Sequence, residues 1–173
     1  MKTIRLAAVA AAALFLSAAA RAETTVELKG THLCCRACVN AVNNTLKGVE
    51  GVTGKCDPKA KTVTITAKDE ATAQKAIDAL AAAGFHGTTD SDKVKVHEDG
   101  GAKAGKVKTL TVTNVHNCCG ACTSAIKNAI KKVDGVTGDT VKARADTFEV
   151  TGDFDAAAVI KALNDAGFHA KAK

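Results

Sequence analysis

The chain of 173 residues lacks tryptophan and tyrosine and contains only one proline and one methionine. Beyond the N-terminal segment its aromatic residues are Phe85, Phe148, Phe154 and Phe168. The formal net charge is +6, but Lys2, Arg5 and Arg21, near the N-terminus, supply half of it. Proteins that bind single-stranded nucleic acid combine a basic groove with aromatic side chains on which the bases stack, and nucleic-acid-binding proteins in general present a basic patch. The sequence therefore argues against a nucleic-acid partner.

Long apolar segments are also lacking, except near the N-terminus. Lys2 and Arg5 precede an apolar run over residues 6–20, and Ala20-Arg21-Ala22 matches the cleavage site of a secretory signal peptide. The run of about 15 residues is shorter than the roughly 20 that span a bilayer. We predict a signal peptide at 1–22, secretion across the inner membrane to the periplasm, and no stable membrane insertion of the mature chain. An uncleaved leader is the alternative.

The remainder of the chain contains an internal repeat. The segment H-L-C-C-R-A-C at 32–38 recurs as H-N-C-C-G-A-C at 116–122, and A-G-F-H at 83–86 recurs at 166–169. Such self-similarity indicates two copies of one structural unit. We expect a first domain at 23–90 and a second at 107–173. The charged, glycine-containing stretch at 91–106 has little to bury and is predicted to be a linker of moderate flexibility.

Hydrophobic periodicity predicts the order strand, helix, strand, strand, helix, strand in each repeat. Val26 and Leu28 alternate with polar residues, as a half-buried strand requires. Helical spacing relates Val39, Val42 and Leu46 in the first repeat to Thr123, Ile126 and Ile130 in the second. Asp69 and Asp153 are the expected N-caps of the second helix of each repeat. This order predicts an α+β fold of two tandem ferredoxin-like βαββαβ sandwiches.

The cysteines suggest the chemistry. Cys35 and Cys38, and likewise Cys119 and Cys122, form a C-x-x-C pair between the first strand and the first helix. The partial positive charge at a helix N-terminus lowers the pKa of a cysteine there and favours the thiolate that metals require. Two thiolates suit Cu(I) or Zn(II), and also Hg(II) or Cd(II), far better than Mg²⁺ or Ca²⁺.

With these motifs the sequence resembles the heavy-metal-associated (HMA) domain family, which includes copper chaperones, the N-terminal domains of metal-pumping ATPases and the periplasmic mercury-binding protein. The resemblance rests on the C-x-x-C pairs, the V-E-G-V and V-D-G-V segments at 49–52 and 133–136, and A-G-F before the last strand. It implies a non-enzymatic metallochaperone with one site per domain and no catalytic residues. It also implies transfer to the cysteines of a partner such as a metal-transporting ATPase.

Family members usually read G-M-x-C-x-x-C, and both repeats depart from that pattern. His32 and His116 replace the glycine, Leu33 and Asn117 replace the methionine, and Cys34 and Cys118 occupy the x position. The methionine anchors the loop in the core, a role that Leu33 suits and that Asn117 fills only with hydrogen-bond partners. The extra cysteines and histidines would extend a two-sulfur site towards a Cys₃His zinc set. Alternatively, they are solvated loop residues, since adjacent cysteines rarely bind one ion.

Other cysteines and histidines receive a simpler interpretation. His86 and His169 are expected to be exposed residues that start an edge strand, with a role beside the metal as the alternative. Phe85 and Phe168 are expected core residues, and Cys56 is a strand cysteine without a ligand role. Two other function classes stay open at this stage, namely a periplasmic thiol-disulfide redox protein and a structural zinc module that binds a protein partner.

Overall fold

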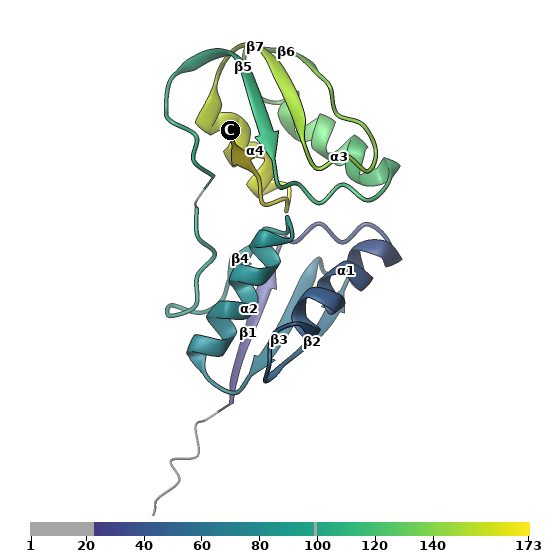
Figure 1. Cartoon of the computed structure of the whole chain (residues 1–173), viewed down its shortest axis with the longest axis vertical. Coiled ribbons are helices and arrows are strands. Elements are labelled where there is room, and N and C mark those ends of the chain that lie inside the picture. Colours follow the sequence, from purple (N-terminus) through teal and green to yellow (C-terminus); the bar gives the residue numbers. More distant parts are fainter. Residues whose placement is uncertain (1–22, 99) are drawn as a thin grey trace, which may run out of the picture.

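Each repeat folds into a small domain with the predicted order of strands and helices (Figure 1). The computed structural model describes residues 23–98 and 100–173, so the predicted signal peptide lies outside the described residues. The first domain consists of β1 (Thr24–Lys29), α1 (Arg36–Lys47), β2 (Val52–Asp57), β3 (Thr62–Ala67), α2 (Glu70–Ala82) and β4 (Thr88–Thr89). The second consists of β5 (Lys106–Thr113), α3 (Gly120–Ile130), β6 (Val136–Asp139), β7 (Phe148–Asp155), α4 (Ala156–Asp165) and β8 (Lys171–Ala172).

Both domains contain an antiparallel four-stranded sheet with the same topology. The strand order is β2-β3-β1-β4 in the first domain and β6-β7-β5-β8 in the second. Two helices cover one face of each sheet, which confirms the ferredoxin-like prediction. Among the helices of the described residues, none is long and apolar enough to cross a membrane.

The buried face of the first sheet follows from the alternation in its sequence. Val26 pairs with Ile65 and Leu28 pairs with Val63 across β1 and β3, and all four side chains are buried. Because successive strand residues point to opposite faces, these four lie on the same face. The helix α1 presents Cys38, Val42 and Leu46 at helical spacing to that face, and Cys38 is the first of its buried residues. The cysteine-containing loop at 32–38, called a metal loop below together with its counterpart at 116–122, is therefore attached directly to the core.

The cap of the last helix differs from the prediction. Asp69 caps α2 as expected, with its carboxylate accepting a hydrogen bond of 2.8 Å from the amide of Thr72. In the second domain the cap is Asp155, which accepts from the amides of Ala157 and Ala158. The expectation for Asp153 was wrong because β7 continues to residue 155 and its buried Phe154 keeps the chain extended past that position.

The linker packs against both domains along one side of the molecule (Figure 1). Val94 and Gly100 are buried, so the expectation that this stretch has little to bury was wrong at those positions. The backbone of Lys95 exchanges two hydrogen bonds with the side chain of Gln74 in α2. Glu98 lies 3.3 Å from the imidazole of His86 in the first domain and accepts a hydrogen bond from Asn164 in the second. The linker therefore makes non-covalent contacts with both domains in addition to connecting them along the chain.

Replacing Asp155 with alanine is expected to lower the urea midpoint of the second domain, because two amides of the first turn of α4 lose their acceptor. The matched control is Asp153→Ala, which removes only exposed ion pairs with Lys106 and Lys108 and should leave the midpoint nearly unchanged. Urea unfolding followed by circular dichroism measures both. Equal destabilisation by the two substitutions would contradict the assignment of the cap.

Candidate metal centre

The metal loops end at the N-termini of α1 and α3. Cys35 and Cys119 are the N-cap residues of these helices, in extended backbone conformation, and no side-chain oxygen caps either helix. The amides of the first turn are consequently available to a cysteine sulfur. Cys38 and Cys122 lie in the first turn, fully buried. Their sulfurs lie 3.7 Å and 3.9 Å from those of the respective N-cap cysteines. Cys35 and Cys38 are called the first pair below, and Cys119 and Cys122 the second pair.

The residue before each cysteine cluster anchors its loop. Leu33 is buried in the first domain, where it fills the place expected for an apolar anchor. Asn117 is equally buried, and its amide group donates to the carbonyls of Lys142 and Ala145 at 2.8 Å and 3.0 Å. Its side-chain oxygen accepts from the hydroxyl of Thr123 at 3.0 Å. The polar anchor thus has the partners that a buried amide requires.

The two metal loops face each other across the domain boundary. The sulfur of Cys34 lies 3.4 Å from that of Cys122, and the sulfur of Cys118 lies 3.5 Å from that of Cys38. Cys35 and Cys119 approach to 3.9 Å. All six cysteines predicted from the sequence as ligands are therefore gathered into one cluster, which we call the sulfur cluster. The repeat pattern identified its members but contained no signal that the two loops meet.

A contact between the two A-G-F-H segments, which we call the seam, brings the loops together. Phe85 and Phe168 form an antiparallel β-bridge. The amide of His86 donates to the carbonyl of Gly167 at 3.1 Å, and the amide of His169 donates to that of Gly84 at 3.0 Å. Each segment thus lends the other a backbone partner, and the two domains are related by approximate two-fold symmetry. Sequence reasoning used A-G-F-H only as evidence of the repeat and of the family, and the motif by itself does not indicate that its two copies contact each other.

Glycine is required in the seam by both conformation and space. Gly84 and Gly167 have φ angles of +84° and +88°, a region that side chains disfavour. A Cβ atom on Gly84 would lie 2.4 Å from the amide nitrogen of His116. A Cβ atom on Gly167 would lie 2.4 Å from the amide nitrogen of His32. The close approach of each domain to the other's metal loop therefore depends on these two residues.

The histidines of the metal loops stack across the seam. The ring of His32 lies over Phe168 with centroids 4.3 Å apart, and the ring of His116 lies over Phe85 at the same distance. The Nε2 atoms of both histidines are buried without a hydrogen-bond partner. The ligand nitrogen of His32 lies within 4.8 Å of the sulfurs of Cys34 and Cys122. The sequence assigned both histidines to the metal site; the structure brings His32 to metal-ligand spacing with two cysteines, whereas His116 belongs to none of the ligand groups among the described residues.

His86 and His169 are buried rather than exposed, so that expectation was wrong. Their Nδ1 atoms lie 3.3 Å apart in the seam, and His86 also faces the carboxylate of Glu98. Both rings sit where the start of an edge strand would ordinarily face solvent, but here the other domain covers that edge. Burial lowers the pKa of His86, although Glu98 acts in the opposite direction.

The thiols of the sulfur cluster differ in acidity. The amide of Cys38 donates to the sulfur of Cys35 and lowers the pKa of that thiol to about 7. A hydrogen bond from the Cys38 thiol lowers the pKa of Cys122 to about 2, and the same interaction raises the pKa of Cys38. Burial raises the pKa of Cys118 to about 12. The metal-free cluster therefore mixes thiolates with protonated thiols, and a soft metal ion would displace the remaining protons.

The comparison with known families agrees with this geometry. The sequence profile of the heavy-metal-associated domain matches residues 27–86 and residues 109–169. The chain belongs to the heavy-metal-associated domain family. Among curated proteins no sequence matches it. Among solved structures it is similar to the N-terminal soluble domains of Bacillus subtilis CopA, at 18% identity and a TM-score of 0.31, over 88% of this chain and 95% of that chain.

Heavy-metal-associated domains bind soft metal ions through cysteines, and the cysteines here are available for that chemistry. All seven cysteines, which lie within the described residues, are free thiols. Groups with metal-ligand spacing form from the six loop cysteines and His32. Cys56 lies apart on β2, where its sulfur contacts the side-chain oxygen of Asn43 at 3.7 Å. It belongs to none of the groups found among the described residues.

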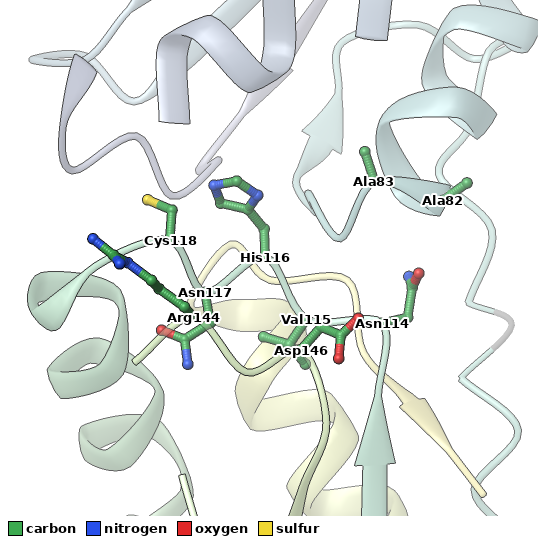
Figure 2. A pocket seen from close by; sticks show the side chains of 9 residues that line it. All are labelled: Ala82, Ala83, Asn114, Val115, His116, Asn117, Cys118, Arg144 and Asp146. Carbon is green, nitrogen blue, oxygen red and sulfur yellow. The ribbon is translucent and has the colours of Figure 1, made fainter. Parts of the chain in front are cut away.

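A cavity of about 430 Å³ opens beside the second metal loop. Figure 2 shows the side chains of Cys118 and His116 directed towards the first domain and that of Asn117 directed into the second. Arg144 and Ala83 line the cavity from opposite domains. It therefore offers a route by which solvent, a chelator or a partner's side chain reaches the sulfur cluster.

Replacing Asn117 with leucine is expected to lower the free energy of unfolding of the second domain by about 1–3 kcal/mol, because two carbonyls and a hydroxyl lose their partner. The matched control in the first repeat is Leu33→Met, an apolar exchange that should cost less than about 1.5 kcal/mol. Urea unfolding of the metal-free protein measures both. An Asn117→Leu variant with an unchanged free energy of unfolding would show that the amide does not anchor the loop.

Acidification is expected to open the seam of the metal-free protein. The closed form holds His86 with a lowered pKa, so it binds fewer protons than the open form, and its stability is lost as the pH falls below the ordinary histidine pKa of about 6.5. Small-angle X-ray scattering should show a larger radius of gyration at about pH 5 than at about pH 7.5. His86→Gln should reduce this difference, whereas His97→Gln in the exposed part of the linker should not. A radius that stays constant with pH would refute the expectation.

Proposed function

We propose that this protein is an exported, non-enzymatic carrier of soft metal ions of the copper, zinc or mercury class. It captures ions on its C-x-x-C loops and passes them to an acceptor. The observation that carries the proposal is the sulfur cluster, in which two helix N-termini bring six thiol groups within reach of one another. No bond of a substrate changes, because the metal ion is cargo.

Capture begins at the accessible side of the cluster, where Cys34 is exposed and Cys35 is partly exposed. Cys35 has a pKa of about 7, so near neutral pH a large share of it is thiolate. Cys34 is exposed, while Cys38 and Cys122 are buried beneath it. An incoming ion therefore meets exposed sulfurs first and is then transferred to buried ones. Each thiol that becomes a ligand releases its proton, and the affinity for the ion rises with pH accordingly.

Release requires that an acceptor's sulfur reaches the bound ion. The exposed Cys34 and the half-buried Cys118 and Cys119 leave one side of the cluster open, and the cavity beside Cys118 widens that access. A cysteine of the acceptor can then replace one protein ligand at a time, so the ion is never without sulfur. A metal-transporting ATPase or another protein with paired cysteines is the proposed acceptor.

The donor set favours Cu(I) or Zn(II) among biologically common ions. Six sulfurs provide the soft ligands that Cu(I) prefers. The ring of His32, which lies within 4.8 Å of two cluster sulfurs, provides the imidazole that a tetrahedral zinc site would add. Hg(II) and Cd(II) fit the same sulfurs and would make the protein a detoxifying scavenger. The periplasmic location is proposed from the predicted signal peptide.

Serine at all six cluster cysteines is expected to abolish stoichiometric copper binding, with a loss of affinity of at least about a hundredfold, because hydroxyls are hard, weak ligands for Cu(I). The measurement is native mass spectrometry of protein released from the periplasm of an expressing bacterium. The same spectrum shows whether residues 1–22 have been removed. Cys56→Ser is the control and should retain all bound metal.

Two results would overturn the proposal. A six-serine variant that keeps its metal would show that the sulfurs are not the ligands. If the native protein carried disulfides and took up no soft metal after reduction, the cysteines would be assigned a redox role instead.

A further inference from the structure

Within the sulfur cluster, each C-x-x-C pair is completed from the opposite domain. Cys118 of the second repeat lies 3.7 Å and 3.5 Å from the two sulfurs of the first pair. Cys34 of the first repeat lies 3.7 Å and 3.4 Å from the two sulfurs of the second pair. The approximate two-fold symmetry of the seam produces the same arrangement twice.

We propose that the two domains exchange a metal ligand across the seam, so that the chain contains two three-sulfur sites of mixed origin. Cys118 completes the site of the first pair, and Cys34 completes the site of the second pair. This inference rests on the proposed function, since it concerns how the same cysteines divide the cargo. It replaces the expectation of one self-contained site per domain.

The exchange explains why both repeats carry two adjacent cysteines. Consecutive residues on an extended backbone point in opposite directions, and the N-caps Cys35 and Cys119 are extended. Two adjacent cysteines are therefore best suited to two different ions, although their sulfurs lie within 4.8 Å of each other in both repeats. With exchange, Cys35 serves its own domain's ion while Cys34 serves the other. The additional cysteine is then a ligand in both repeats.

Sulfur–sulfur distances favour three-sulfur sites over linear two-sulfur sites. With a metal–sulfur bond of about 2.3 Å, sulfurs lie about 4.6 Å apart in a linear site, about 4.0 Å apart in a flat three-sulfur site and about 3.8 Å apart in a tetrahedral site. The three separations around the first site are 3.5 Å, 3.7 Å and 3.7 Å. Those around the second are 3.4 Å, 3.7 Å and 3.9 Å. Both triangles are far from the linear separation and lie nearest to the tetrahedral one, so each can place three sulfurs around one ion and leave a position for a fourth donor.

The loop histidine supports the same division. His32 belongs to the first repeat, yet its ligand nitrogen groups with Cys34 and Cys122, which form one edge of the second site. Its Nε2 is buried and has no hydrogen-bond partner. The whole His-x-Cys segment of the first repeat therefore faces the second site, and the imidazole is available as a fourth donor. Self-contained sites are the competing arrangement in both repeats, because the three loop cysteines of each repeat also lie within 4.8 Å of one another.

The test removes one pair and asks which remaining cysteine matters. In full-length mature protein with Cys35→Ser and Cys38→Ser, only the second pair remains. In this background Cys34→Ser should lower the Cu(I) affinity at least about tenfold, because one of three thiolates is lost. Cys118→Ser is the matched control and should change the affinity less than about twofold. Competition with bicinchoninate under reducing conditions measures the affinity, and circular dichroism checks the fold.

The mirror background tests the other site. With Cys119→Ser and Cys122→Ser, the dependence should reverse, so that Cys118→Ser weakens binding and Cys34→Ser does not. If the affinity depended in each background on the third cysteine of the same domain as the remaining pair, the exchange would be overturned and two self-contained sites would be left. Equal losses from both substitutions, or complete loss of binding in the parent backgrounds, would also overturn it, because the six sulfurs would then act as one indivisible site. A native chain that binds no Cu(I) would instead refute the proposed function.

Discussion

The arrangement of this molecule depends on one backbone contact, the antiparallel bridge between Phe85 and Phe168 in the seam. Two amides and two carbonyls are satisfied by the opposite domain there, and such groups are costly to bury unpaired. The contact is possible because Gly84 and Gly167 have positive φ angles and leave no Cβ in the path of the other loop. Stacking of each loop histidine on the opposite phenylalanine then sets the register. The positions of the cysteines follow from this contact, since the metal loops adjoin it in both domains.

The seam also changes what the metal loops can do. A family loop that stands alone offers two sulfurs and an open side, whereas here each loop meets the other and more sulfurs lie within reach of one another. Additional ligands would raise the affinity for a metal ion, whereas reduced access would slow the exchange of that ion with an acceptor. The structure balances the two because Cys38 and Cys122 are buried while Cys34 remains exposed. Linker contacts through Glu98 to both His86 and Asn164 help to hold this arrangement, so the domains are coupled outside the metal site as well.

Predictions from the sequence succeeded where a local pattern controls the structure. The alternation around Val26 and Leu28 and the helical spacing through Val42 locate the core, because side-chain direction repeats every two residues in a strand and every 3.6 in a helix. They failed where the structure of a residue depends on elements outside its own local pattern. Asp153 resembles a cap as closely as Asp155 does, but the length of β7 decides between them. His169 looks exposed until the first copy of the motif, in the other domain, covers it.

The sequence alone determined that the chain has two ferredoxin-like repeats, that it belongs with heavy-metal-associated domains, and which cysteines have the C-x-x-C spacing of that family. These conclusions rest on spacing along the chain, which a single sequence records in full. Only the tertiary structure decided that the six sulfurs converge and that His86 meets His169 in a buried pair. Contacts between domains depend on shape and backbone complementarity over surfaces far apart in sequence. A repeat shows that two sites exist, but only packing of the two copies shows that they share a boundary.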